Sequence, residues 1–280
     1  MREIFDKLEF RAFSYEDDPE AIVDMHRCAE TLEGSWFDAT STCKLHSKLI
    51  TKIPGSSWVV TYGNMIFAHA DLVKASTGEG VVIAWRVHSD YHFPQVIKKM
   101  LEGLKAEAAK RECVGLLIFG DNPNIVSDLN MAGCKPDREY AYARSSECET
   151  GLILEHKPIN IHPDDIKRHD LQPFLGSPLP AAYLTYRATM AAEQGLFHFR
   201  RPALYEINFS NHSYIASFDG REWHVFKKGS FKGDKEAISS ILKTIASINP
   251  SRILLSAAAM EASDLIPASD GVYYDFFVQI

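Results

Sequence analysis

The sequence has few cysteines, and they form no motif that would bind a metal or build a disulfide framework. Its five cysteines are odd in number, and none stands in a Cys-x-x-Cys pair. Small disulfide-stapled domains and thiolate zinc sites both need regularly spaced cysteines. The sequence therefore predicts reduced thiols that contribute mainly to packing.

A long apolar run and an excess of basic residues are also lacking. No stretch reaches the ~18 apolar residues of a membrane helix, and the first ten residues carry charges where a signal peptide has its apolar core. Asp and Glu number 37 against 30 Lys and Arg, which gives a net charge of −7. Nucleic-acid binding needs clustered positive charge. We therefore expect a cytoplasmic protein that binds neither a membrane nor nucleic acid.

Two kinds of catalytic site find no support in the sequence. No Gly-x-Ser-x-Gly elbow occurs, so a serine hydrolase of that type is not predicted. His162, Asp164, Asp165 and His169 invite a metal hypothesis, but their stretch contains no complete set of ligands at a suitable spacing. We predict no metal.

The length of the chain predicts two modules. At 280 residues it exceeds one ordinary domain of about 100 to 150 residues, and 46% hydrophobic residues are ample for a core. Residues 151–180 are rich in His, Pro and Asp, as linkers are. We expect a domain over 1–150, a linker over 151–180 and a second α/β lobe over 181–280.

The first half shows an alternation of strand and helix patterns. Residues 93–111 place Val96, Met100 and Leu104 on one helical face, and VGLLIF at 114–119 is typical of a strand buried on both faces. The predicted elements are a strand at 8–15, helices at 21–32 and 43–53, strands at 57–61, 65–75 and 80–87, a helix at 93–111, a strand at 114–119, a short helix at 124–132 and a strand at 136–144.

This order of elements, together with two local segments, resembles the GNAT superfamily of N-acetyltransferases over about half of the chain. The segment from Val87 to His92 is similar to the family's strand end before its long helix, and the segment from Phe119 to Asn124 to its strand-Asn-helix ending. The resemblance implies a mixed central sheet flanked by helices, acetyl-CoA as cosubstrate and an amine on a small molecule or peptide as acceptor.

The resemblance also implies a set of residues that contact acetyl-CoA. Backbone N–H groups at a helix start suit a diphosphate, because the helix dipole favours an anion there. In the family, small residues let the phosphates approach this turn, whereas Gln95 and Ile97 occupy those positions here and Pro94 has no N–H. We expect the backbone N–H groups of Gln95, Val96 and Ile97 to point outward from this turn. The implied contacts are Val87, His88, His92, Phe93, Gln95, Val96, Ile97, Lys98 and Asn122.

The catalytic positions depart from the family pattern. The Tyr that often protonates the departing thiolate corresponds to Leu129, so Tyr140 and Tyr142 on the following strand are the nearest candidates for this acid. Glu79 precedes the strand that often supplies a carboxylate base. These departures leave two interpretations open: an acetyl-CoA-dependent N-acetyltransferase, or a non-catalytic GNAT-like module that binds an acyl-CoA, another ligand or a partner.

The second half repeats part of the order of the first. A helix is predicted at 181–195, strands at 203–209, 213–218 and 222–227, a helix at 234–248, and strands at 252–258 and 271–280. One interpretation is a degenerate second GNAT-like lobe. The Gly- and Lys-containing loop at 226–233 is an alternative anion site, although Asp234 beside it would repel an anion.

Overall fold

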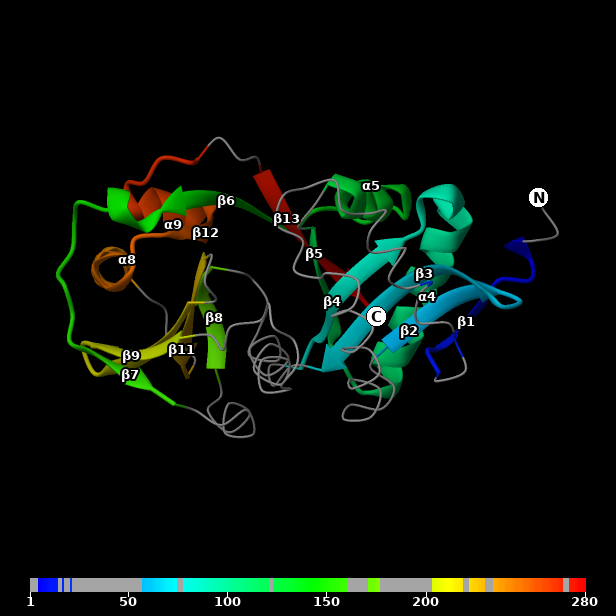
Figure 1. The fold of residues 1–280 in the computed structure, drawn as a ribbon, viewed down its shortest axis with the longest axis horizontal. Helices are drawn as coiled ribbons and strands as arrows, with labels where there is room; N and C mark the ends of the chain where they lie inside the picture. The colour runs from blue at the N-terminus through cyan, green and yellow to red at the C-terminus, as the bar shows by residue number, and fades with distance from the viewer. Residues whose placement is uncertain are drawn as a thin grey trace. The chain divides into compact units, whose positions relative to one another are not determined.

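The computed structural model describes residues 5–14, 17, 21, 57–74, 78–120, 123–160, 171–176, 203–218, 222–229, 234–268 and 272–280. They form an α/β fold with helices packed on a mixed β-sheet, which confirms the predicted fold class (Figure 1). The helices predicted at 43–53 and 181–195, most of the one at 21–32, and the stretch from His162 to His169 lie outside the described residues.

The chain divides into two compact units with boundaries that differ from the predicted ones. The N-terminal lobe comprises Met1–Lys74, Gly78–Asp137 and Phe276–Ile280, and the C-terminal lobe comprises Ala75–Thr77 and Arg138–Asp275. The predicted linker at 151–180 contains two strands of the C-terminal lobe. Such short strands are set by pairing with distant segments, and the composition of the linker does not reveal them.

The N-terminal lobe is an antiparallel meander followed by a parallel strand. Its elements are β1 (Glu9–Ala12), β2 (Ser57–Tyr62), β3 (Met65–Lys74), β4 (Gly80–Val87), the 3₁₀ turn η1 (Ser89–Tyr91), α4 (Pro94–Lys110), β5 (Gly115–Gly120) and α5 (Pro123–Met131). Strands β1 to β4 pair antiparallel in chain order, and β5 pairs parallel with β4. The end of β13 (Val272–Gln279) is the other neighbour of β5.

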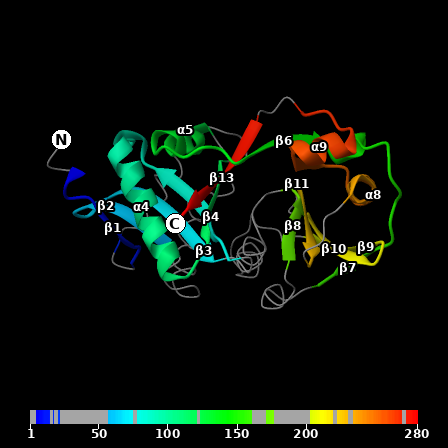
Figure 2. The same cartoon turned by 180° about the vertical axis from the view of Figure 1, so that it is seen from behind.

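Helix α4 covers one face of this sheet (Figure 2). Val96, Ile97, Met100 and Leu104 are at most 1% exposed, which confirms the amphipathic helix predicted at 93–111. Pro94 begins the helix, where its missing N–H costs no intrahelical hydrogen bond.

The C-terminal lobe repeats this plan. Its elements are β6 (Arg138–Arg144), the 3₁₀ turn η2 (Ser145–Glu147), β7 (His156–Ile159), β8 (Leu171–Leu175), β9 (Ala203–Phe209), β10 (His212–Phe218), β11 (Glu222–Lys228), α8 (Lys235–Ile248), β12 (Arg252–Ser256), α9 (Ala257–Ser263) and the start of β13. Strand β10 pairs antiparallel with β9 and β11, and β12 pairs parallel with β11. The series β9-β10-β11-α8-β12-α9 thus matches β2-β3-β4-α4-β5-α5, a repeat that the sequence predicted except for α9.

The sixth predicted strand of the first half is found in the other lobe. Strand β6 pairs with β12 on one edge and with the start of β13 on the other. Tyr140 and Tyr142 therefore belong to the C-terminal lobe. The strand itself is predicted correctly, but the alternation of apolar and polar residues does not determine which strands it pairs with.

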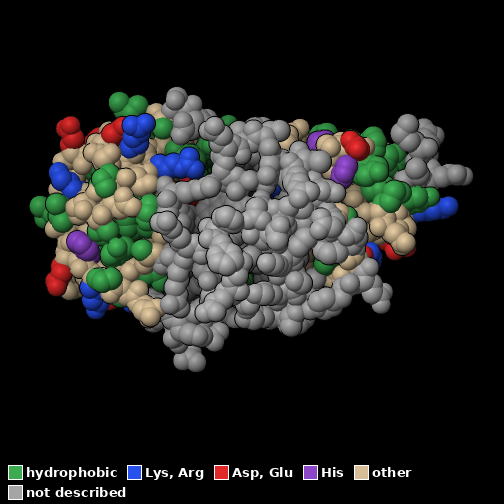
Figure 3. All heavy atoms as spheres, viewed as in Figure 1, with side chains coloured by type: hydrophobic (Ala, Val, Ile, Leu, Met, Phe, Trp, Pro, Cys, Tyr) green, Lys and Arg blue, Asp and Glu red, His purple; other side chains and the backbone are tan. Residues whose placement is uncertain are grey.

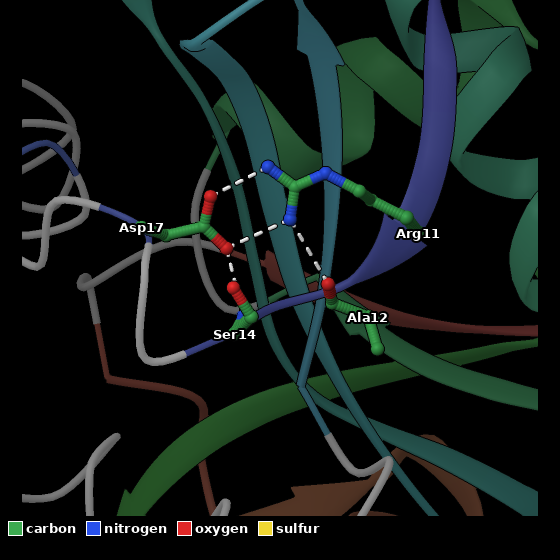
Figure 4. Close-up of polar contacts among 4 residues, drawn as sticks. All are labelled: Arg11, Ala12, Ser14 and Asp17. Carbon is green, nitrogen blue, oxygen red and sulfur yellow. Dashed lines mark hydrogen bonds and ion pairs between the residues drawn. The ribbon is translucent and has the colours of Figure 1, made fainter.

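A bidentate ion pair stabilises the turn that follows β1 (Figure 4). The Arg11 guanidinium donates to both carboxylate oxygens of Asp17, at 2.7 and 2.5 Å, and the Ser14 amide donates to the same carboxylate at 2.7 Å. Burial by itself would raise the pKa of Asp17, but the hydrogen bonds from Arg11 and Ser14 outweigh it and lower the pKa.

The described surface carries charges of both signs. Lys and Arg side chains lie among Asp, Glu and apolar side chains on the described parts of the face shown in Figure 3. Within the described residues, no helix is both long and apolar enough to cross a membrane.

We expect acid to destabilise the C-terminal lobe through Glu206. Its carboxylate is bound by Lys157 at 2.9 Å, Lys228 at 3.0 Å and Ser213 at 2.8 Å. These hydrogen bonds lower the pKa of Glu206 to about 2. A lowered folded-state pKa gives stability that is present above the unfolded pKa of about 4.3 and is lost as the pH falls toward 2.

The expected loss is roughly 1 to 3 kcal/mol of unfolding free energy between about pH 5 and pH 2. Urea unfolding at several pH values would measure it. Glu206→Gln should remove this part of the pH dependence, whereas Glu155→Gln, at an exposed position of the same lobe, should keep it. Equal pH profiles for the two variants would contradict the assignment.

Candidate functional site

Strands β4 and β5 pair over only part of their length. Gly80–Val82 pairs with Leu116–Ile118, and beyond that point β4 continues to Val87 with β3 on its other edge. Among the described residues, no strand pairs with the second edge of Ile83–Val87. We call this region, Ile83–Val87 of β4 with Phe119–Gly120 of β5, the β4–β5 fork. Peptide groups along such an edge require hydrogen-bond partners from water or from a ligand.

A bulge lies where β4 leaves β5. Asp71 pairs with Ala84 and Leu72 with Val82, so Ile83 is an extra residue in β4. A bulge bends its strand, and bulges are common next to active sites. The bend therefore begins at the first residue of the fork.

Helix α4 begins after the open end of the fork, but it offers fewer amide donors than predicted. The Phe93 carbonyl accepts hydrogen bonds from the amides of Val96 at 3.0 Å and Ile97 at 3.2 Å. Pro94 has no N–H, and Gln95 is exposed. In the described part of the chain, the Gln95 N–H is the one amide of this turn without an acceptor. The prediction of three available amides is corrected to one, because a shared carbonyl takes the other two.

The other predicted contacts differ in how accessible they are. The side chains of Val96 and Ile97 are fully buried, and the Phe93 ring packs edge-on against Phe5 at 5.4 Å. Lys98 is exposed one turn into the helix. These side chains therefore belong to the packing or the outer face of α4.

The turn between β4 and α4 brings the two predicted histidines to one end of the fork. Val87 is buried at the end of β4. The His88 ring accepts from the Asp90 amide at 3.1 Å and lies 4.9 Å from the Tyr91 ring. Asn122, the predicted pantetheine contact, lies outside the described residues.

His92 joins a buried hydrogen-bonded network that links three elements of the N-terminal lobe. Its Nε2 atom bonds one carboxylate oxygen of Asp128 in α5, and the Trp85 indole N–H in β4 donates to the other oxygen at 2.8 Å. Asp128 and Trp85 are each 2% exposed, whereas the His92 side chain is 33% exposed. The network therefore holds the start of α4 against β4 and α5, the elements that border the fork.

Burial raises the pKa of Asp128, and the hydrogen bonds from Trp85 and His92 only partly oppose this effect. Neither Asp128 nor Trp85 was among the predicted site residues. A signal was present: Ile125, Asp128 and Leu129 share one face of α5, and all three are buried. A carboxylate on an apolar helix face usually has a buried partner.

None of the three predicted catalytic residues is part of the fork. Glu79 precedes β4 at the end where β4 pairs with β5. It comes four residues before Ile83, which corresponds to about 13 Å along an extended strand. In the C-terminal lobe, the Tyr140 hydroxyl donates to Asp275 at 3.0 Å. Burial and the neighbouring Glu222 carboxylate raise the pKa of Tyr142. The structure therefore assigns none of the three to the fork.

No family model matches the sequence, and no curated protein is similar to it. Its fold is nevertheless shared by solved structures. A candidate acetyltransferase from Pyrococcus horikoshii matches 98% of this chain and 90% of its own with a TM-score of 0.61 at 10% identity. A tandem GNAT protein from the clavulanic acid biosynthesis pathway matches 97% of both chains with a TM-score of 0.51 at 12% identity.

The chain has a GNAT fold. A GCN5-related N-acetyltransferase from Kribbella flavida adds a match over 96% of this chain and 70% of its own, with a TM-score of 0.52 at 12% identity. All three matches extend through both lobes, which agrees with the repeated order of strands and helices. At these identities the likeness establishes the fold, and the GNAT resemblance seen in the sequence is confirmed at that level.

Proposed function

We propose that the protein is an acyl-CoA-dependent N-acyltransferase whose N-terminal lobe binds acetyl-CoA at the β4–β5 fork. The observation that carries the proposal is the edge of Ile83–Val87, with which no described strand pairs, directly before the start of α4. An extended arm with amide groups, such as pantetheine, can pair with this edge as an added strand does. The diphosphate would then lie toward the turn that holds His88, His92 and Gln95.

The residues fit the two ends of such a ligand to different degrees. The bulged edge of β4 suits the pantetheine arm, and its N–H groups can polarise a thioester carbonyl. At the phosphate end, the Gln95 N–H remains as a donor, and the His92 ring is partly exposed. In the reaction, the acceptor nitrogen forms a bond to the acyl carbon, the carbon–sulfur bond breaks, and the proton lost from nitrogen ends on the CoA sulfur.

The proposal predicts that the Gln95 amide contributes to acetyl-CoA affinity. Gln95→Pro removes this N–H within the first turn of α4, where proline is tolerated, and Gln95→Ala keeps it. Loss of a charge-assisted hydrogen bond should weaken binding roughly 10-fold or more in the Pro variant and leave the Ala variant unchanged. Calorimetric titration with acetyl-CoA measures both, and thermal unfolding checks that both variants are folded.

Catalysis is tested separately from binding. Incubation of the protein and acetyl-CoA with a panel of amines, followed by detection of free thiol, should show amine-dependent release. Binding without release would support the alternative interpretation, a non-catalytic acyl-CoA-binding module, which the reduced set of amides at α4 favours. Absence of binding at millimolar acetyl-CoA would remove both.

A further inference from the structure

The C-terminal lobe contains a second fork, formed by β11 and β12. These strands pair in parallel only at Glu222 with Arg252 and at Trp223 with Ile253, while β11 continues to Lys228. The repeated order of elements places this fork where β4 and β5 diverge in the N-terminal lobe.

Strand β8 fills this second fork. It pairs antiparallel with β11, with Leu175 opposite Val225 and Leu171 opposite Lys228. A strand has two hydrogen-bonding edges, and β10 occupies one edge of β11 over 223–227. Strand β8 must therefore lie on the other edge, the one that β12 uses at Glu222 and Trp223.

The packing shows that β8 is built into this position. Leu171 is 1% exposed and packs with Ile215 and Phe226, and Leu175 is 4% exposed in the main core of the lobe. Gly176 follows β8 with φ +96°, and a Cβ atom there would lie 2.8 Å from both the Trp223 oxygen and the His224 Cα. Gly176, directly after β8, therefore lies against Trp223, the last residue of β11 that pairs with β12. The two backbones are too close there for a side chain at position 176.

Helix α8, which follows this fork, has side-chain carboxylates at its start. The Asp234 side chain caps α8 by accepting from the Ala237 amide at 2.8 Å, and Glu236 lies in the first turn. A carboxylate at a helix start satisfies the amide and the dipole that would otherwise attract a phosphate. In α4 the residue that precedes the helix is Phe93, which has no side-chain cap.

We infer that the C-terminal lobe is permanently occupied by its own chain, with β8 in the place of an extended ligand and Asp234 in the place of its anionic end. Each chain then has one acetyl-CoA site, in the N-terminal lobe. The stoichiometry rests on the proposed function, whereas the occupation of the second fork does not. The Gly- and Lys-containing loop at 226–233 is accordingly no phosphate site.

Two measurements on the unmodified protein test this inference. Calorimetric titration with acetyl-CoA should give one site per chain, and two sites would overturn the inference. Hydrogen exchange without ligand should show that the amides of Val225–Lys228 that face β8, and not those that bond β10, are slowed roughly 100-fold or more relative to an unstructured peptide. Acetyl-CoA should leave these amides unchanged while it slows exchange at Ile83–Val87.

The outcomes separate the two proposals. No heat of binding would contradict the proposed function alone, and slow exchange at the β8-facing amides of Val225–Lys228 would still support β8 as the resident strand. Fast exchange at those residues, or protection there only after addition of acetyl-CoA, would overturn the resident strand.

A pair of glycine variants provides a structural control. Gly176→Ala places a methyl group against β11 and should speed exchange at Val225–Lys228. Gly229→Ala has a similarly left-handed backbone, φ +83°, but no atom within 4 Å of the added Cβ, and should leave exchange unchanged. Equal exchange in both variants would show that β8 is not seated at the end of the fork.

Discussion

Gly151→Ala is expected to unfold the C-terminal lobe at temperatures where the unmodified protein is stable. Gly151 has φ +90°, a conformation that costs an L-residue roughly 1 to 2 kcal/mol. An added Cβ would lie 2.5 Å from the Ser239 carbonyl carbon and 2.6 Å from the Ser240 amide nitrogen. Both atoms belong to the backbone of α8, which cannot move aside as a flexible side chain can.

The surrounding contacts increase the expected cost. The Leu152 amide donates to Ser240 Oγ at 3.1 Å, and the Leu154 amide donates to Thr244 Oγ1 at 2.9 Å. Separation of this segment from α8 would weaken both bonds. With about 1 to 3 kcal/mol for overpacking, the total loss is roughly 2 to 5 kcal/mol.

Equilibrium urea unfolding followed by tryptophan fluorescence would measure the loss, because Trp223 is buried in this lobe. Gly229→Ala is the matched control, since its backbone is also left-handed and its Cβ would meet no atom within 4 Å. It should lose only about 1 to 2 kcal/mol. Similar losses in the two variants would mean that the close approach to α8 contributes nothing.

Asp128→Ala is expected to destabilise the N-terminal lobe by roughly 2 to 5 kcal/mol. The substitution leaves the buried Trp85 indole N–H without an acceptor and releases His92 from α5. Asp128→Asn is the matched control, because its amide oxygen can accept from Trp85 and its volume is nearly the same. Thermal and urea unfolding of the two variants would measure the difference.

The Asn variant also tests the direction of the Asp128 pKa shift. A carboxyl group whose folded-state pKa is raised favours the folded state below its unfolded pKa of about 3.9, and this contribution is lost as the pH rises through the folded-state pKa. Asp128→Asn should therefore gain stability relative to the unmodified protein as the pH rises through that pKa. A constant difference across this range would show that burial does not govern the titration of Asp128.

The local sequence was a good guide to the elements with strong patterns. The apolar face that includes Val96, Met100 and Leu104 predicted α4, and the run VGLLIF predicted β5, because burial imposes the periodicity of helix or strand on the sequence. The short strands β7 and β8 were missed. Each has only four or five residues, and β8 exists because β11 offers an edge at that place.

The candidate site adjoins the segments that the sequence singled out, but its contacts could not be predicted. The family resemblance pointed to the turn from Val87 to His92 and to the start of α4, which adjoin the fork. It did not reveal that Phe93 accepts from two of the three expected donors, or that His92 bonds to Asp128. Such contacts depend on residues that are close in space and distant in the chain.

The sequence by itself determined the order of the strongly patterned strands and helices, most of the repeat of that order in the two halves, and the amphipathic faces that form the core. Only the tertiary structure decided which strand edges pair with each other. It places β6 in the C-terminal lobe and β8 in the β11–β12 fork, and the described strands leave the β4–β5 fork unpaired. The reason is that the periodicity of a sequence reflects which side chains are buried. The backbone N–H and C=O groups along a strand edge are the same in every sequence, so the pairing partner of an edge is fixed only when the strands come together.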